Sequence, residues 1–192
     1  MKWIVYIILP AFLVSCDLFS TRPAEDPNQT KSNFTPPTIE EDLITNIINS
    51  FADKNVDNYT RCFNLSITAK PFTFVPSSSA QVAYQGIWED WNTESERQYF
   101  SSIITTLPNS RLIRLSLSIE QSSFSRLGDS TKYSSHYTIS IPQINSEDLY
   151  YEGNVEFTMI RNSSQIWVIY YWKDNAIGDS PTWSDLKGAY VN

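Results

Sequence analysis

The chain has 192 residues, with 21 acidic and 14 basic side chains and a formal net charge of -7, and this length suits one domain of ordinary size. The acidic balance argues against a nucleic-acid partner, because proteins that bind the phosphate backbone do so with clustered Lys and Arg. One His and two Cys are too few for a Cys/His zinc site, and we predict neither a metal nor a cofactor.

The first sixteen residues have the order of a secretory signal. Lys2 supplies a positive charge, Trp3–Val14 is uncharged and apolar apart from a break at Pro10, and the small Ser15 precedes Cys16. As a helix this apolar run reaches about 18 Å, well short of a hydrocarbon core roughly 30 Å thick. A cleaved signal is therefore favoured, and an uncleaved anchor or an ordinary secretory signal is the alternative.

The run Leu13-Val14-Ser15-Cys16 resembles the lipobox of bacterial lipoproteins. The resemblance implies cleavage between Ser15 and Cys16, a diacylglyceryl group on the Cys16 thiol and acylation of the new amino terminus. Two or three acyl chains hold a protein stably on a membrane. We therefore expect a lipid-anchored protein of the bacterial cell envelope. Asp17 resembles an inner-membrane retention signal of enterobacteria, a rule that is not general, so both membranes stay open.

Three parts of the chain are predicted: a signal peptide over 1–15, a flexible tether over 16–37 and a folded domain over 38–192. The tether is rich in Pro and polar residues, so it buries too little apolar surface to offset its ordering entropy. Lipidation of Cys16 would leave Cys62 as the only thiol. We therefore expect no intramolecular disulfide, and Cys62 as a small buried apolar residue.

Two long amphipathic helices are predicted in the domain, each from a capping box followed by apolar residues at helical spacing. Thr38 with Glu41 begins the first, over about 39–53. Thr93 with Glu96 begins the second, which ends at Pro108. Each helix has one apolar face that a second layer must cover.

Shorter elements surround these helices. We expect a short helix over about 56–63, a strand over 72–75 and a last helix after Thr182. Beyond Asn109 the apolar residues alternate with polar ones, which predicts strands with one dry face. The sequence places these strands at 113–120, 133–141, 155–159 and 166–172.

The strand over 166–172 is apolar on both faces. Such a strand needs a cover on each side. A second copy of the chain is one candidate for that cover, which makes a homodimer through the sheet face a possible assembly.

This order of elements looks like the nuclear transport factor 2-like, SnoaL-like or cystatin-like cone. The segments that carry the resemblance are Asp53–Tyr59 with Phe63, Trp167–Ile169, Trp172–Asp174 and Thr182–Ser184. The resemblance implies an α+β domain in which a curved antiparallel sheet wraps around the N-terminal helices. None of these segments is specific for an activity.

The sequence offers weak candidates for chemistry. His136, the only His, falls on the polar face of its strand. The Asp53-x-Asn55-x-Asp57 start of a calcium loop lacks the required Gly and the final Glu, so these residues are better explained as helix caps. The carboxylates of Glu89, Asp90, Glu94 and Glu96 suit a helix N-terminus, and division of acid and base work between them is the alternative.

Aromatic residues are abundant, with 6 Trp, 11 Tyr and 10 Phe. They either fill the core or line a cavity for an apolar ligand. The candidate pocket residues are Phe74, Trp91, Tyr137, Phe157 and Trp172.

The function that follows from the sequence is an envelope lipoprotein without a catalytic residue that can be named. We expect a binding or interaction module for a small apolar ligand or another envelope protein, attached to membrane lipid through Cys16. The alternative is an enzyme similar to the isomerases, dehydratases and cyclases of the superfamily, with a Tyr or carboxylate of the pocket as acid or base.

Overall fold

The computed structural model describes residues 33–66, 69–108, 110–144 and 146–191. All of them belong to one compact unit, Ser32–Asn192. The predicted signal peptide, its cleavage site and Cys16 lie outside the described residues. Among the helices of the described part, none has the length and apolar character needed to cross a membrane.

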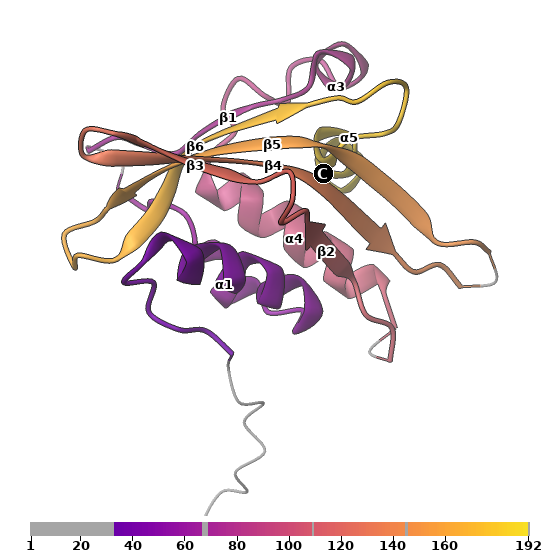
Figure 1. Cartoon of the computed structure of the whole chain (residues 1–192). Helices are drawn as coiled ribbons and strands as arrows, with labels where there is room; N and C mark the ends of the chain where they lie inside the picture. The colour runs from indigo at the N-terminus through magenta and orange to yellow at the C-terminus, as the bar shows by residue number, and fades with distance from the viewer. Residues whose placement is uncertain (1–32, 67–68, 109, 145, 192) are drawn as a thin grey trace, which may run out of the picture. The chain divides into compact units, whose positions relative to one another are not determined.

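The unit is α+β, as the sequence predicted (Figure 1). In chain order the elements are α1 (Glu40–Ala52), α2 (Val56–Thr60), β1 (Thr73–Val75), α3 (Ser78–Ala83), α4 (Thr93–Thr106), β2 (Arg114–Leu117), β3 (Ser123–Leu127), β4 (Ser130–Ile141), β5 (Leu149–Arg161), β6 (Trp167–Asn175) and α5 (Trp183–Tyr190).

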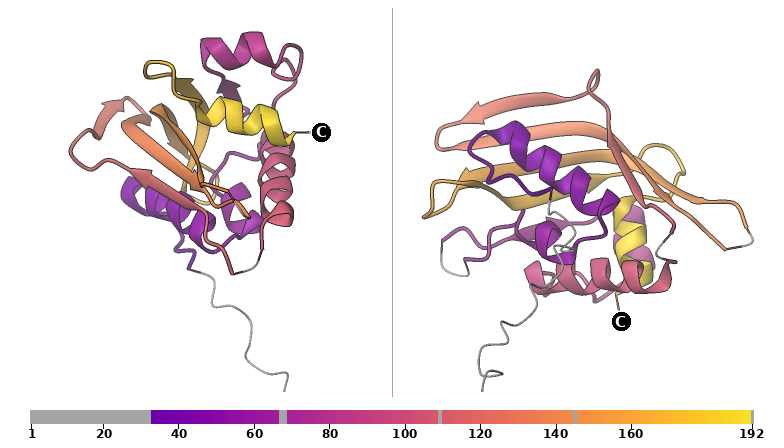
Figure 2. Two further views of the ribbon diagram at one scale, coloured as in Figure 1. Left: turned by 90° about the vertical axis from the view of Figure 1, so that its right-hand side faces the viewer. Right: turned by 90° about the horizontal axis from the view of Figure 1, so that it is seen from below.

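The described strands form one curved, open sheet in the order β1-β6-β5-β4-β2. Strand β3 pairs with the first part of β4, on the same edge as β2. Its pairs are antiparallel except for β1 with β6, which are parallel. Figure 2 shows α1, α4 and α5 on one side of the sheet. The fold therefore has a sheet layer and a helix layer, with the core between them.

A row of aromatic side chains crosses the sheet at one level. Phe74 of β1 pairs in register with Trp172 of β6, which is opposite Phe157 of β5, which is opposite Tyr133 of β4. Paired residues in a sheet point to the same face. This register brings large rings from four strands to the face that the helices cover.

Both predicted capping boxes are wrong in their residues, although the helices exist. The N-cap of α1 is Ile39, which has no side-chain cap, and the acidic first turn of the helix offers favourable charge there instead. The N-cap of α4 is Asn92, whose box partner is Ser95. Asn caps a helix at least as well as Thr. Because Asn92 and Ser95 form the capping box, Glu96 is not needed as a capping partner, and its side chain is buried in the core.

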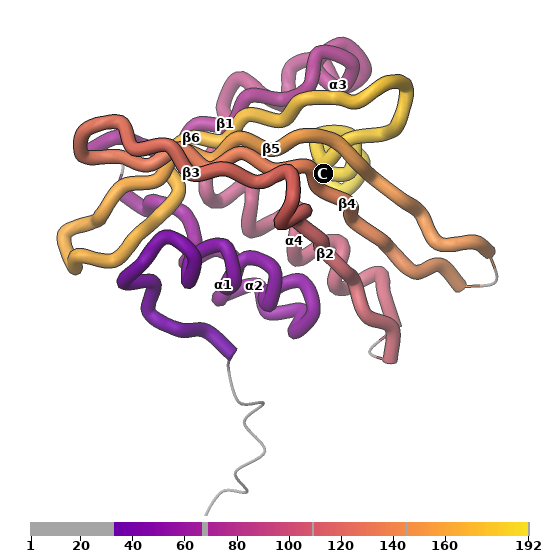
Figure 3. The backbone as a smooth tube through the Cα atoms, viewed as in Figure 1, coloured from indigo at the N-terminus to yellow at the C-terminus, as the bar shows by residue number. Residues whose placement is uncertain are grey.

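The sequence missed α3 and β3. Strand β3 is exposed along its whole length, so its sequence lacks the dry and wet alternation by which strands are recognised. Figure 3 shows it as the outer strand of a hairpin with β4. Strands β4 and β5 are also longer than predicted, since β4 begins at Ser130 and β5 extends over Leu149–Arg161.

The segment before α1 packs against the domain. Asn46 of α1 accepts a hydrogen bond from the Thr35 backbone N–H (3.0 Å) and donates one to the Thr35 carbonyl (2.6 Å). The Trp167 backbone N–H donates to the Pro37 carbonyl (2.8 Å). Residues 33–37, which the sequence assigned to the tether, are therefore part of the folded unit.

Strand β6 finds much of its cover within the chain. Val168 and Ile169 are neighbours on opposite faces, and they are 2% and 0% exposed. The apolar character of both faces is thus satisfied at these positions by residues of the same chain. A homodimer through the sheet face stays a prediction. Residues other than Val168 and Ile169 would have to form its interface.

Candidate functional site

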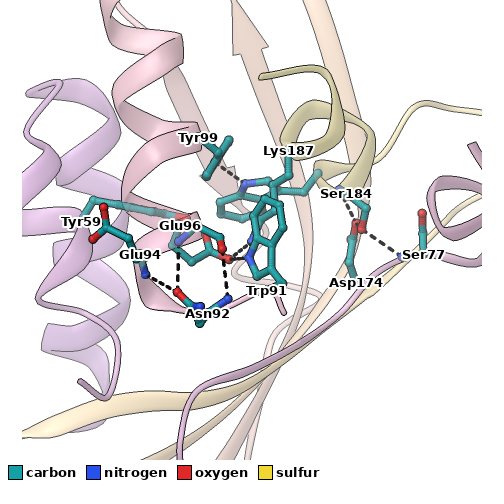
Figure 4. Close-up of polar contacts among 12 residues, drawn as sticks. Tyr59, Ser77, Trp91, Asn92, Glu94, Glu96, Tyr99, Asp174, Ser184 and Lys187 are labelled. Carbon is teal, nitrogen blue, oxygen red and sulfur yellow. Dashed lines mark hydrogen bonds and ion pairs between the residues drawn. The ribbon is translucent and has the colours of Figure 1, made fainter. Parts of the chain in front are cut away.

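An ion pair lies in the core, between the sheet and the helices α4 and α5 (Figure 4). Lys187 comes from α5 and Glu96 from α4, and both side chains are 0% exposed. Charged side chains are rarely buried to this extent unless they are paired. We therefore treat this pair and its surroundings as the candidate functional site.

Both carboxylate oxygens of Glu96 accept hydrogen bonds from the chain. One carboxylate oxygen accepts from the Trp91 indole N–H (2.7 Å) and from the Lys187 ammonium. The other accepts from the Tyr59 hydroxyl (2.7 Å). Hydrogen bonds of this kind offset the cost of burying a carboxylate. The arrangement leaves Glu96 well solvated by protein groups instead of water.

Aromatic rings enclose the Lys187 ammonium. Its Nζ lies 3.4 Å from the ring centroid of Trp172 and 3.7 Å from that of Phe74. The rings of Trp91 and Tyr99 are farther away, at 5.4 and 5.5 Å. The electron-rich face of an aromatic ring attracts a cation, most strongly where water is excluded. The chain thus builds an aromatic cage and fills it with its own lysine.

Burial changes the ionisation of this group. Desolvation lowers the pKa of Lys187 to about 8, against the opposing attraction of Glu96 and Asp174. Desolvation, with the nearby Glu96 charge as the next cause, raises the pKa of Tyr59 well above its ordinary value. Burial likewise raises the pKa of Tyr99. Lys187 is thus a buried base whose pKa is shifted toward neutral pH.

A second buried carboxylate fixes the start of α5. Asp174 of β6 accepts from the Tyr137 hydroxyl (2.7 Å) through one oxygen. Its other oxygen accepts from the Ser184 backbone N–H (2.7 Å) and hydroxyl (2.5 Å). Desolvation raises the pKa of Asp174, although these hydrogen bonds oppose the shift. A carboxylate at a helix N-terminus also complements the helix dipole.

Trp183 connects the surroundings of the two buried carboxylates. Its backbone N–H donates to the Tyr137 hydroxyl (2.7 Å), and its indole N–H donates to the Tyr99 hydroxyl (2.8 Å). The ring packs against Trp172 with a centroid distance of 4.5 Å. Helix α5 therefore inserts two side chains, Trp183 and Lys187, into the interior and holds both by hydrogen bonds.

Two glycines permit this close packing. A Cβ atom at Gly188 would lie 2.5 Å from the ring of Tyr84, and one at Gly153 would lie 2.6 Å from the Tyr137 hydroxyl. Gly153 is opposite Tyr137 across β4 and β5. The glycine leaves room for the Tyr137 side chain to reach Asp174 over the neighbouring strand.

The structure brings the five candidate pocket residues into one buried region. Phe74, Trp91 and Trp172 surround the Lys187 ammonium. Phe157 packs against Trp172 (5.0 Å between centroids), and Tyr137 bonds to Asp174. All five side chains are at most 5% exposed. A ligand that reached them would have to displace α5, because Lys187 and Trp183 occupy the space between the rings.

Sequence reasoning missed Lys187 and Asp174 as site residues and placed Glu96 at a helix start. A signal was present, because Lys187 follows Trp183 by four residues and Leu186 by one, within the buried stripe of α5. Glu96 likewise shares a stripe with Tyr99 and Phe100. A charged residue inside an apolar stripe indicates a buried charge, and a buried charge needs a partner.

The other candidate residues have structural positions. His136 is half-buried between the buried Ser135 and Tyr137, as the strand alternation predicted. Asn55 caps α2 by accepting from the Asn58 backbone N–H (2.9 Å), and Asp53 ends α1, which confirms the capping explanation. In the part of the chain that the structure describes, no group of three His, Cys, Asp or Glu side chains is placed to hold a metal.

Cys62 is buried, as predicted. Its thiol donates to the Asn58 carbonyl with a sulfur to oxygen distance of 3.3 Å, and desolvation raises its pKa. A thiol in this state is a poor nucleophile, since the thiolate is the reactive form. Cys62 therefore contributes packing and no evident chemistry.

Comparison with solved structures defines the fold class. The chain is similar to a candidate aromatic ring hydroxylase from Novosphingobium aromaticivorans, with 12% identity, coverage of 76% of this chain and 92% of the other, and a TM-score of 0.54. It is similar to a nuclear transport factor 2-like superfamily protein from Salmonella enterica serovar Typhimurium, with 9% identity, coverage of 73% and 87%, and a TM-score of 0.52.

A third similar structure is a candidate dehydratase of the nuclear transport factor 2-like family from Streptomyces avermitilis, with 10% identity, coverage of 71% and 91%, and a TM-score of 0.51. No family model matches the sequence, and no curated protein matches it. The domain therefore has the nuclear transport factor 2-like, or cystatin-like, fold. At these identities the likeness defines the fold alone.

Proposed function

We propose that this protein is a lipoprotein of the bacterial cell envelope whose nuclear transport factor 2-like domain binds a partner or ligand and does not catalyse a reaction. Lipidation rests on the sequence of the first sixteen residues, with Cys16 as the acylated residue and Ser15 before the cleavage point. The proposal for the domain rests on its interior.

The observation that supports a binding module is that donors of the chain itself bond to both oxygens of each interior carboxylate. Glu96 and Asp174 each accept three hydrogen bonds from the chain itself. A general acid or base must reach a proton of the substrate within hydrogen-bond distance. Both oxygens of each carboxylate are bonded within the chain and both side chains are buried, so neither carboxylate can reach a substrate unless the interior opens.

Metabolic labelling with a fatty acid tests the anchor. The wild-type chain should incorporate the label and sediment with membranes, whereas Cys16→Ala should do neither. Cys62→Ala is the matched control, because it removes the other thiol and should label like wild type. Equal labelling of wild type and Cys16→Ala would refute lipidation at Cys16.

The alternative function, an isomerase-like or dehydratase-like enzyme, has one observation in its favour. Lys187 is a base with a pKa of about 8 inside the fold, next to a carboxylate. For Lys187 to act on a substrate, α5 would have to open. Acetylation of the native protein by acetic anhydride measures that access, with the exposed Lys173 as the internal control.

A binding module predicts that Lys187 is acetylated far more slowly than Lys173, because its amine is enclosed and bonded to Glu96. Labelling at equal rates would show that the interior opens readily. That result would favour the enzyme over the module.

A further inference from the structure

A second site lies on the surface, at the end of the sheet where β5 turns into β6. It is a pocket of about 410 Å³, within the range of about 300–1,000 Å³ that is usual for small-molecule sites. Its charged lining residues are Arg61, which follows α2, and Arg161, at the end of β5. The lining contains no carboxylate, although the chain as a whole is acidic.

Aromatic rings position both guanidinium groups. The Arg61 guanidinium carbon lies 3.9 Å from the ring centroid of Phe34, and that of Arg161 lies 5.3 Å from the ring centroid of Trp167. Asp57, one turn before Arg61, pairs with Arg97 instead (2.7 Å). Among the described residues no carboxylate forms an ion pair with either arginine.

The base of the pocket is apolar. Phe63 and Val168 are 1% and 2% exposed, and Ile160 and Ile166 are half-buried beside them. Arginine side chains that lack a carboxylate partner favour a bound oxyanion, with which their N–H groups form paired hydrogen bonds. The pocket thus combines two positive charges at its rim with an apolar base.

We propose that this pocket binds a phosphate ester that carries an apolar chain. The two guanidinium groups match the charge of a phosphate group, and the apolar base accommodates part of the chain. The source is either a phospholipid of the membrane or a soluble alkyl phosphate. Neither possibility uses the buried site around Lys187.

The position of the pocket suits a membrane lipid. The segment that precedes α1 contacts this end of the sheet, since Arg161 donates to the Thr38 carbonyl (3.4 Å) and Arg61 covers Phe34. Figure 1 shows the turn between β5 and β6 near the start of α1. If Cys16 is lipidated, as in the proposed function, sixteen residues (17–32) separate the acylated residue from the segment that contacts this end of the sheet.

Isothermal titration calorimetry of the full chain with hexyl phosphate tests the site. Two partial ligands separate the contributions to binding. Inorganic phosphate carries the charge without the chain, and hexanol carries the chain without the charge. Arg61→Gln with Arg161→Gln should weaken binding of hexyl phosphate at least about tenfold. Arg114→Gln, at an exposed arginine of β2, removes one positive charge outside this pocket and should leave binding unchanged.

A second variant guards against misfolding of the first. Leu65→Glu places a negative charge on a pocket residue that is 60% exposed, so it removes no buried contact and should also weaken binding. Wild-type affinity in both variants, or equal losses in Arg114→Gln, would overturn the site. Equal affinity for inorganic phosphate and hexyl phosphate would overturn the role of the apolar base.

The source of the ligand is tested with protein held in nanodiscs. If bilayer lipid fills the pocket, hexyl phosphate binds more weakly in phosphatidylglycerol discs than in phosphatidylcholine discs. Equal affinity in the two discs identifies the ligand as a soluble molecule. Binding in solution does not require acylation, so a negative labelling result at Cys16 refutes the anchor and leaves the pocket to be judged by its own variants.

Discussion

Lys187 and Glu96 form an ion pair that is fully buried in the core. The pair is surrounded by rings and bonded to Trp91 and Tyr59. Removal of one partner from a buried ion pair is far more costly than replacement of both by apolar groups. This asymmetry makes the role of each residue measurable.

Glu96→Gln should destabilise the protein by about 3–5 kcal/mol, because it leaves the Lys187 ammonium buried without its counter-ion. Lys187→Met together with Glu96→Gln should cost less than the sum of the single changes. Urea unfolding of the four proteins gives the coupling free energy. Additive losses would mean that the two side chains do not interact.

The lowered pKa of Lys187 gives stability a definite pH dependence. The folded pKa of about 8 lies below the value of 10.5 for a free lysine. Between these values the unfolded chain binds more protons, so the Lys187 contribution to stability rises with pH through this window. The gain is limited to a few kcal/mol, at about 1.4 kcal/mol per pKa unit.

The measurement is the difference in unfolding free energy between wild type and Lys187→Met, followed from pH 7 to pH 10. The difference should move in favour of wild type as the pH rises. Tyr59 and Tyr99 have raised pKa values and stay protonated in the fold over this range. A flat difference would show that Lys187 has an ordinary pKa.

Helix α5 is the element that closes the interior. It is short, and its capping box of Thr182 and Asp185 satisfies its first backbone N–H groups. Its other contacts are tertiary, through Trp183, Lys187 and the close approach of Gly188 to Tyr84. Helices of this length depend on tertiary packing for their stability.

Gly188→Ala tests the fit of α5. In a free helix this change is favourable by about 1 kcal/mol. Here the new methyl group would overlap the Tyr84 ring, and overpacking of this kind costs about 1–3 kcal/mol. We expect a lower melting temperature. In a Tyr84→Ala background the same change should become neutral or stabilising, and a loss there would locate the clash elsewhere.

At the scale of the whole domain, α5 completes a core that the sheet and α4 cannot close alone. Without it, the rings of Phe74, Trp91 and Trp172 would face solvent. Exposed aromatic surface of this extent is typical of loosely packed states.

A chain that ends at Pro181 should therefore bind the dye ANS and lose cooperative unfolding in urea. A chain that ends at Tyr190 keeps α5 and serves as the control. If the first truncation unfolds with the same cooperativity and m-value as the full chain, α5 is an addition to a core that is already complete.

Most of the local structure could be predicted from the sequence alone. Apolar spacing located α1, α4, β2, β4 and β5, because each buries one face and its period reflects the geometry of the backbone. A run that is apolar on both faces located β6. Apolar spacing also supported the prediction that Cys62 is buried, and the order of elements pointed to the fold class. Strand β3 was not predicted, because all its residues are exposed and its sequence shows no alternation of apolar and polar residues.

The pairing of side chains from different elements could not be predicted, because it depends on how the elements pack. Glu96 and Lys187 are 91 residues apart in sequence, and Asp174 of β6 meets Tyr137 of β4 across the intervening strand β5. The apolar repeat of a helix or strand indicates which of its faces is buried. It does not indicate which side chain of another element packs against that face. The buried charges, the cage around Lys187 and the two arginines of the surface pocket are therefore products of packing between elements.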